Sequence, residues 1–395
     1  MSTETRISEP HNVVGTTITI TAAGIDIEAF ETVHNSGSGP GLLLISDRAG
    51  VDASLRKRAE LFGAEGYSVI ATGCEVTTEQ MIDLLAFLKS RPETSGGIVA
   101  VGHGAGASKL ISMAPEADLR AMVGFDAMEI EGLPEALDRV RCPFVLQFGT
   151  RNEPQASALA KSLKSALRRK DGSRVFDWSE AAPGFAMPLR DVFDKRVDSL
   201  AHTRTLELIR RVVGPYYDFA ALFAEHTYHE FTTKDVDATM ETMIDEPYVN
   251  HVPTLAGGVG HEMLKRFYKY HFVDQNAGGR DRLRISYTLG SDRVVLESYT
   301  KFRHDCVIDR YFPGIAPTGK VVEIATVIIV KFRGDKVCHE HLYWDQGSAL
   351  KQIGVLQADG LPIAGAEAAR KVLDETLPSN IFMQEAWASS DGKPV

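Results

Sequence analysis

The sequence predicts two successive folds, an α/β domain with a mostly parallel sheet and then an α+β domain with antiparallel strands. In the first half, short apolar runs alternate with amphipathic helical patterns, and glycine or proline separates the units. In the second half, helical patterns come first, and long segments of alternating apolar and polar residues follow them. The Gly214-Pro215 pair lies where one pattern gives way to the other.

Four short apolar segments are expected to form buried strands of the first domain. They are residues 41–46, 67–71, 98–101 and 144–148. Between them, residues 55–62 and 81–88 repeat apolar side chains at helical spacing. Strands that alternate with helices in this way are typical of a parallel sheet that helices cover on both faces.

The segment GIVAVGHGAGA, residues 97–107, carries the most specific motif of the first half. An apolar strand runs into Gly-x-Z-x-Gly and a helical pattern follows, which describes the nucleophile elbow of α/β-hydrolases when Z is serine or cysteine. Together with AELFGAEGYSVIA (59–71), RCPFVLQFG (141–149) and HTRTLELIRRVVG (202–214), this segment resembles the dienelactone hydrolase family. The resemblance covers residues 1–214 and implies an α/β-hydrolase sandwich.

The resemblance also implies a catalytic triad, and this chain departs from it at all three positions. Gly104 stands at the nucleophile position, Asn152 at the acid position and Pro183 at the histidine position. Glycine has no side chain that could attack, and proline cannot act as a base. His103, inside the motif, is interpreted as a packing residue, and Asp47 corresponds to an acidic residue of the family's pocket. We therefore expect this domain to be catalytically inactive.

The second half begins with helical patterns near Phe219, Asp235 and Leu264. Strands are expected at residues 283–289, 293–303, 321–333 and 336–345. The segments YVNH (248–251), PGIAPTGK (313–320) and WDQGSALKQIG (344–354) resemble the SnoaL-like polyketide cyclases of the nuclear transport factor 2-like superfamily. This resemblance implies a cone-shaped α+β barrel over residues 215–356, with residues 357–395 as a C-terminal arm and tail.

The segment 336–345 carries most of the predicted chemistry. Read with a period of two, one of its faces presents His339, His341, Tyr343 and Asp345. Such side chains cannot face an apolar core unpaired without a cost of ~1–3 kcal/mol each, so this face must meet water, an interface or a polar cavity. The SnoaL-like resemblance implies that Asp345 is a general base, with His341, Tyr343 and His251 as electrophilic partners.

Further residues are expected to contact a substrate in the same cavity. They are Glu297, Tyr299, His304, Trp344 and Tyr248. A metal was considered for His226 with His229 and for His339 with His341, but neither pair comes with a recognisable third ligand. The chain contains no GxGxxG or P-loop motif. We therefore expect neither a metal nor another cofactor.

The composition narrows the possible partners and the location. The chain has 395 residues and a formal net charge of -10, whereas nucleic-acid-binding surfaces are basic. No apolar run is long enough to cross a bilayer, and residues 1–12 do not have the pattern of a signal peptide. The four cysteines are scattered, without metal or disulfide spacing. We expect a cytoplasmic homodimer that binds a small molecule and neither nucleic acid nor a membrane.

These observations lead to one favoured function and two alternatives. The favoured function is a cofactor-independent lyase, isomerase or cyclase that acts on a small carbonyl or polyketide-like compound by proton abstraction in the C-terminal cavity. The first alternative is an ester or lactone hydrolase of the dienelactone hydrolase type with an atypical site, in which His103 or Asp47 activates water. The second is a non-catalytic ligand-binding or scaffold protein.

Overall fold

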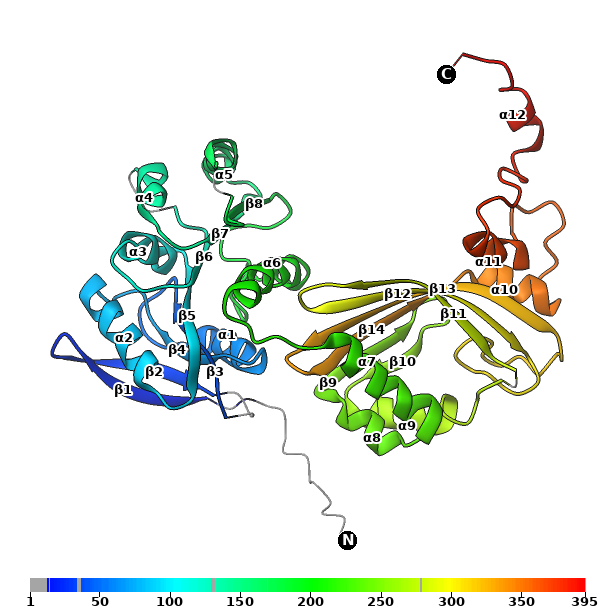
Figure 1. Ribbon diagram of the computed structural model, residues 1–395, viewed down its shortest axis with the longest axis horizontal. Coiled ribbons are helices and arrows are strands. Elements are labelled where there is room, and N and C mark those ends of the chain that lie inside the picture. Colours follow the sequence, from blue (N-terminus) through cyan, green and yellow to red (C-terminus); the bar gives the residue numbers. More distant parts are fainter. Residues whose placement is uncertain are drawn as a thin grey trace, which may run out of the picture. The chain divides into compact units, whose positions relative to one another are not determined.

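The computed structural model describes residues 13, 15–33, 37–128, 132–168, 170–277 and 279–394. The polar segment 1–12, which entered the signal-peptide prediction, lies outside the described residues. The chain divides into two compact units, the first ending at Tyr217 and the second beginning at Asp218 (Figure 1). This division lies close to the seam predicted at Gly214-Pro215. The predicted arm after residue 356 belongs to the second unit.

The first unit contains an eight-stranded sheet in the order β1-β2-β4-β3-β5-β6-β7-β8. Its strands are β1 (Thr16–Ala22), β2 (Ile25–Thr32), β3 (Gly39–Ile45), β4 (Ser68–Thr72), β5 (Thr94–His103), β6 (Ala121–Phe125), β7 (Phe144–Gly149) and β8 (Arg174–Trp178). From β4 to β8 all neighbours are parallel, and β1 and β2 add an antiparallel edge. The strands predicted at residues 41–46, 67–71, 98–101 and 144–148 correspond to β3, β4, β5 and β7, respectively.

Helices cover both faces of this sheet, as Figure 1 shows. On one face lie α1 (Ala53–Ala64) and α6 (Lys195–Val213). On the other lie α2 (Thr78–Ser90), α3 (Ala105–Met113), α4 (Leu133–Arg139) and α5 (Pro154–Ala166). Because the central strands are buried on both sides, they read as unbroken apolar runs, and every residue of β3, β4, β6 and β7 is buried. This unit has the α/β-hydrolase fold.

The second unit contains a six-stranded sheet in the order β10-β9-β14-β13-β12-β11. Its strands are β9 (Met243–His251), β10 (Ala256–Val259), β11 (Asp281–Leu289), β12 (Arg293–Arg303), β13 (Val321–Arg333) and β14 (Lys336–Tyr343). The bounds predicted for β12 and β13 are correct. The YVNH segment lies in β9, which pairs in parallel with β14.

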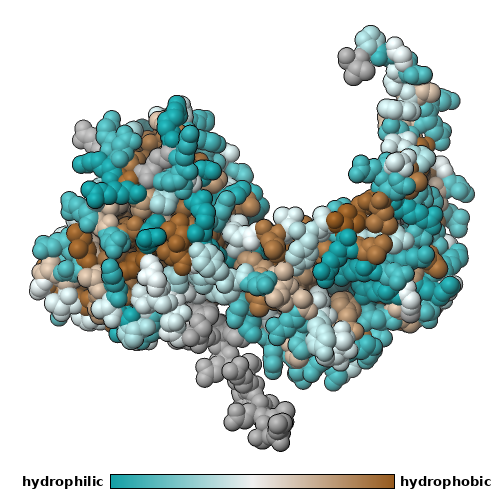
Figure 2. Space-filling model, viewed as in Figure 1, coloured by the Kyte–Doolittle hydropathy of each residue, from teal (hydrophilic) through white to brown (hydrophobic). Residues whose placement is uncertain are grey.

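Helices of the second unit precede and follow its main strands. The earlier ones are α7 (Phe219–Tyr228), the π-helical turn η1 (His229–Thr233), α8 (Val236–Glu241) and α9 (His261–His271). After β14 come α10 (Gln346–Ile353) and α11 (Ala366–Leu373), which pack on β13. The chain continues through α12 (Gln384–Ala388). Two large apolar side chains are exposed there, Phe382 just before the helix and Trp387 within it. Much of the surface drawn in Figure 2 is hydrophilic. None of the helices in the described ranges is both long and apolar enough to cross a membrane.

Candidate functional site

The turn between β5 and α3 keeps the backbone shape of a nucleophile elbow. Gly104 has φ 49° and ψ -120°, a conformation that strains residues with a side chain, and its N–H donates to the carbonyl of Phe125 at 2.8 Å. Gly106 lies so close to β3 that an added Cβ would be 2.3 Å from the carbonyl oxygen of Ser46. A Cβ at Gly104 would instead lie 3.0 Å from the Cβ of Asp47. The point from which a nucleophile would project therefore faces Asp47.

Asp47 belongs to a charged cluster beside this turn. Its Oδ1 accepts hydrogen bonds from Ser46 Oγ at 3.1 Å and from Arg190 Nη2 at 2.9 Å. Arg190, whose side chain is largely buried, also pairs with Asp52 at 3.0 Å. One guanidinium is thus shared between two carboxylates. Arg48 lies 4.0 Å from Oδ2 of Asp47, so the two carboxylates face two guanidinium groups at the carboxyl end of the sheet, the edge where α/β proteins bind their ligands.

Asp126 joins the ends of neighbouring strands next to the elbow. It follows β6, and its two carboxylate oxygens accept the N–H groups of Gly149 and Gly184, each at 2.7 Å. Burial raises the pKa of Asp126 to about 7, although both backbone hydrogen bonds act in the opposite direction. Pro183 directly precedes Gly184, and Asn152 lies in the turn after Gly149. Gly104, Asn152 and Pro183, the three positions that the resemblance assigns to the triad, thus lie at the same end of the sheet.

His103 does not reach this surface. Its side chain is 2% exposed, and its ring stacks on Phe125 with centroids 4.5 Å apart. Burial lowers the pKa of His103 well below its ordinary value, so the imidazole is neutral. His103 packs inside the unit, as the sequence analysis expected.

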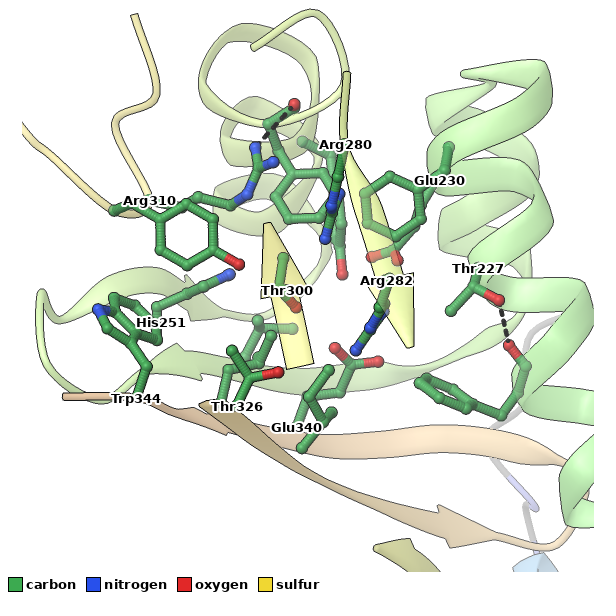
Figure 3. Close-up of a pocket in the computed structure, with 18 residues that line it drawn as sticks. Thr227, Glu230, His251, Arg280, Arg282, Thr300, Arg310, Thr326, Glu340 and Trp344 are labelled. Carbon is green, nitrogen blue, oxygen red and sulfur yellow. Dashed lines mark hydrogen bonds between the residues drawn. The ribbon is translucent and has the colours of Figure 1, made fainter. Parts of the chain in front are cut away.

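The second unit has a pocket between its sheet and its helices (Figure 3). Its charged and titratable lining includes Glu230, Glu340, Arg282, Arg310 and His251. Of these, the sequence analysis identified only His251. The other four come from η1, β14, β11 and the loop after β12, segments that are far apart in the sequence.

The pocket lies against the face of β14 opposite to the predicted one. Glu340 and Leu342 line it, whereas His339 and His341 lie on the other face, with their Nε2 atoms 2.8 Å apart. Tyr248 packs edge-on against His339 there, with ring centroids 4.7 Å apart. The alternation itself was predicted correctly. The helices cover the more apolar face of β14, and the only carboxylate on that face is Glu340.

Asp345, the predicted general base, caps a helix instead of lining the pocket. Its Oδ1 accepts the N–H of Ser348 at 3.2 Å and its Oδ2 accepts the hydroxyl of Ser348 at 2.9 Å, at the start of α10. Asp345 is exposed to solvent. Because β14 ends at Tyr343, the two-residue alternation does not extend to position 345. The prediction that Asp345 lies in the cavity is wrong.

Several other predicted site residues also lie outside the pocket lining. Tyr343 is 39% exposed, and Glu297 accepts a hydrogen bond from Ser286 on the neighbouring strand. Tyr299 donates to Glu323 at 2.9 Å, and His304 is buried against Phe312. Besides His251, Trp344 lines the pocket, so the structure does not bring the predicted set together.

His251 is held in place by its backbone surroundings. It is 1% exposed, and its Nδ1 lies 3.1 Å from the carbonyl oxygen of Ala256, to which it donates. Burial, together with the positive charge of Arg310, lowers the pKa of His251 to about 4. At neutral pH it is therefore an uncharged member of the pocket wall.

The two pocket carboxylates meet a histidine that lies behind them. His226 Nε2 is 3.3 Å from Glu230 Oε1 and 3.1 Å from Glu340 Oε1, and all three side chains are buried. His226 lies on α7, and the π-helical turn that follows carries Glu230 four residues later. Burial lowers the pKa of His226, but the two carboxylates outweigh it and raise that pKa to about 10. The His-x3-Glu spacing and the lone carboxylate on the apolar face of β14 were the available sequence signals.

Comparison with known proteins supports one of the two resemblances. Residues 73–213 match the model of the dienelactone hydrolase family. A carboxymethylenebutenolidase from Pseudomonas sp. (strain P51) is 25% identical over 128 residues, which are 32% of this chain and 53% of that protein. The chain thus spans about half the length of this curated relative.

Solved structures match parts of this chain at low sequence identity. A dienelactone hydrolase-like promiscuous phosphotriesterase, P91, from metagenomic libraries is 15% identical, covers 51% of this chain and 100% of its own, and has a TM-score of 0.44. A SnoaL-like polyketide cyclase from Jannaschia sp. CCS1 is 17% identical, covers 36% of this chain and 98% of its own, and has a TM-score of 0.29.

The family match overturns the function that the sequence analysis favoured. That function was a lyase, isomerase or cyclase reaction in the C-terminal cavity. The family model and the curated relative instead indicate the ester and lactone hydrolases, the reaction class kept as the first alternative. The displacement of Asp345 from the pocket removes the proposed base of the favoured reaction as well.

Proposed function

We propose that this chain hydrolyses a small ester or lactone at the elbow of its first unit, by direct attack of water. The observation that carries the proposal is the match of residues 73–213 to the dienelactone hydrolase family, combined with an elbow whose backbone shape persists around Gly104. Because Gly104 has no side chain that could form an acyl-enzyme, we propose water as the attacking nucleophile.

Asp47 is the proposed general base. A Cβ at Gly104 would lie 3.0 Å from the Cβ of Asp47, so the side chain of Asp47 begins next to the nucleophile position. Two donors contact Oδ1, which leaves lone pairs of the carboxylate for a water molecule. His103 is the weaker candidate, because it is 2% exposed and stacked inside the unit.

The proposed reaction proceeds in two steps. Water attacks the carbonyl carbon while its proton passes to Asp47, and the N–H of Ala105 stabilises the oxyanion. That N–H belongs to the first turn of α3, where N–H groups have no acceptor inside the helix. The tetrahedral intermediate then expels the alkoxide, which takes the proton back from Asp47 and leaves a carboxylic acid and an alcohol. A lone general base contributes about 10²- to 10⁴-fold, so we expect slow turnover.

The test compares two substitutions in the same charged cluster. Hydrolysis of aryl esters and of a carboxymethylene butenolide, the compound type in the relative's name, is measured for the wild type, D47N and D52N. Both variants remove one carboxylate charge next to Arg190, and asparagine still caps α1 at position 52. We expect D47N to lower the rate about 10²- to 10⁴-fold and D52N to change it little. Full activity of D47N would remove Asp47 from the mechanism.

A single turnover in heavy-oxygen water separates the two roles that Asp47 could have. If Asp47 is a base, the product acid contains the heavy oxygen in the first turnover. If the Asp47 carboxylate itself attacks, it expels the alkoxide and forms a mixed anhydride. Attack of water on the Asp47 carbonyl carbon then releases an unlabelled first product and leaves the heavy oxygen on Asp47, so an unlabelled product with labelled enzyme identifies this route.

A second candidate function is ligand binding without turnover. The replacement of all three triad positions, Gly104, Asn152 and Pro183, favours it. A binder would take up a lactone with saturation and release it unchanged, which calorimetry followed by chromatography of the ligand would detect.

For the second unit we propose a SnoaL-like cone and pairing of chains into a homodimer. The YVNH and WDQGSALKQIG segments, residues 248–251 and 344–354, support the first part. A crystal structure and the molecular mass in solution test the two parts separately.

A further inference from the structure

Three donor atoms of the second unit already have the spacing of a metal site. Nε2 of His226 and one carboxylate oxygen each of Glu230 and Glu340 lie within 4.8 Å of one another. The two N···O distances are 3.3 and 3.1 Å. Ligands held ~2.0–2.2 Å from one ion, at angles between octahedral and tetrahedral, are about 3–3.5 Å apart. A small divalent ion would fit among these atoms with little movement.

The hydrogen bonds behind His226 orient the ring for this role. Its Nδ1 lies 2.5 Å from Thr242 Oγ1, and that hydroxyl donates to the carbonyl of Thr239 at 2.6 Å. Because a threonine hydroxyl has one hydrogen, Thr242 must accept from Nδ1, which therefore carries a proton. Nε2 is then directed at the carboxylates. Metal-binding histidines are oriented in this way by a partner of their second nitrogen.

The atoms that face one another are not joined by a well-formed hydrogen bond. Nε2 of His226 and Oε1 of Glu340 are both fully buried, and neither has a partner of acceptable geometry among the described residues. Two buried carboxylates without a positive charge between them would repel each other strongly. Arg282, whose positive charge acts on Glu340, offsets part of this repulsion, and a proton on Nε2 or on Glu340, or a cation in the space that the three groups surround, would offset the rest.

The position of the cluster favours a site that a ligand can reach. Glu230 and Glu340 line the pocket, and Figure 3 shows them pointing toward one another from the helical side and from the sheet. Glu230 is carried by a π-helical turn, a distortion that often occurs at functional sites. A cation bound here would have protein ligands on one side and the pocket on the other, which leaves coordination positions open.

We propose that His226, Glu230 and Glu340 bind a divalent transition-metal ion, with an open coordination position that faces the pocket. One imidazole and two carboxylates suit zinc, manganese or ferrous iron. Arg310, held by the carbonyl of Gln275 at 2.9 Å and by Asn276 at 2.8 Å, adds a fixed positive charge to the same pocket. An anionic group could then bridge the ion and Arg310. This site is independent of the hydrolytic proposal for the first unit.

The test measures metal binding by the full chain. Protein freed of metal with a chelator is titrated with Zn²⁺ and separately with Mn²⁺ by calorimetry, and bound metal is counted after gel filtration. We expect one ion per chain for at least one metal. The conservative variants E230Q and E340Q should each weaken binding about 10- to 100-fold or more, because each removes a charged ligand.

Two control variants separate this site from other surfaces. E297Q makes the same change on the opposite face of the sheet, and H341A disrupts the His339–His341 pair, whose Nε2 atoms are 2.8 Å apart. Both should bind metal like the wild type, and near-ultraviolet circular dichroism without metal should show E230Q and E340Q folded. If neither metal binds, or if binding survives E340Q and is lost in H341A, the proposal is overturned.

Discussion

Asp126 makes the stability of the first unit depend on pH. Burial raises its pKa from 3.8 to about 7 in the folded chain. Between these values the unfolded chain has released the proton while the folded chain still holds it, so the unfolding free energy falls as pH rises. The contribution of protonated Asp126 to the unfolding free energy is fully present below about pH 4 and is lost by about pH 7 to 8. A shift of about 3 units corresponds to about 4 kcal/mol at most.

The D126N variant isolates this effect, because asparagine does not titrate. Asparagine has only one side-chain oxygen, so the variant keeps a well-formed hydrogen bond with only one of the N–H groups of Gly149 and Gly184. The loss of unfolding free energy from the other hydrogen bond does not vary with pH. We therefore expect the difference between wild type and D126N to shift by up to about 4 kcal/mol in favour of asparagine between about pH 4 and pH 8. The assay is urea unfolding at several pH values, followed by hydrogen exchange of amides in the first unit. Parallel pH profiles for the two proteins would refute the reasoning.

Three further predictions concern single substitutions. G104S should lower the melting temperature, because a serine with φ 49° is strained by about 1–3 kcal/mol, and an unchanged melting temperature would contradict the strain at the elbow. D198A should destabilise the first unit by about 3–5 kcal/mol in chemical unfolding, since it leaves the fully buried Arg58, now 2.8 Å from Asp198, without its partner. R370A removes the two 2.7 Å hydrogen bonds from Arg370 on α11 to Glu323. Limited proteolysis should therefore cleave the variant near α11 sooner than the wild type. Equal cleavage rates would show that packing alone holds the helix.

Several elements could be predicted from the sequence because local rules decide them. A strand that helices cover on both faces must be apolar throughout, so β3 and β7 appear as unbroken runs. Long antiparallel strands alternate, so the bounds of β12 and β13 followed from that pattern. The elbow at Gly104 also has a local signature, since its glycines permit a turn that other residues resist.

The sites depended on information that no local segment contains. Alternation along β14 divides its side chains into two sets, but the helices that pack on the sheet decide that the set with Glu340 faces the pocket and the set with His341 does not. Asp345 looked like the next residue of the strand, yet the chain turns there into α10, and its carboxylate accepts the N–H and the hydroxyl of Ser348 in the first turn of that helix.

The sequence by itself determined the α/β fold of the first unit, the strand periods and the glycine at position 104, because each depends on neighbouring residues alone. Only the tertiary structure decided that Glu340 meets His226 and Glu230, more than a hundred positions earlier, and how close Asp47, in the loop after β3, lies to Gly104. Contacts of this kind arise when separate elements bury their apolar faces together, and the polar groups carried along must find partners in the same place.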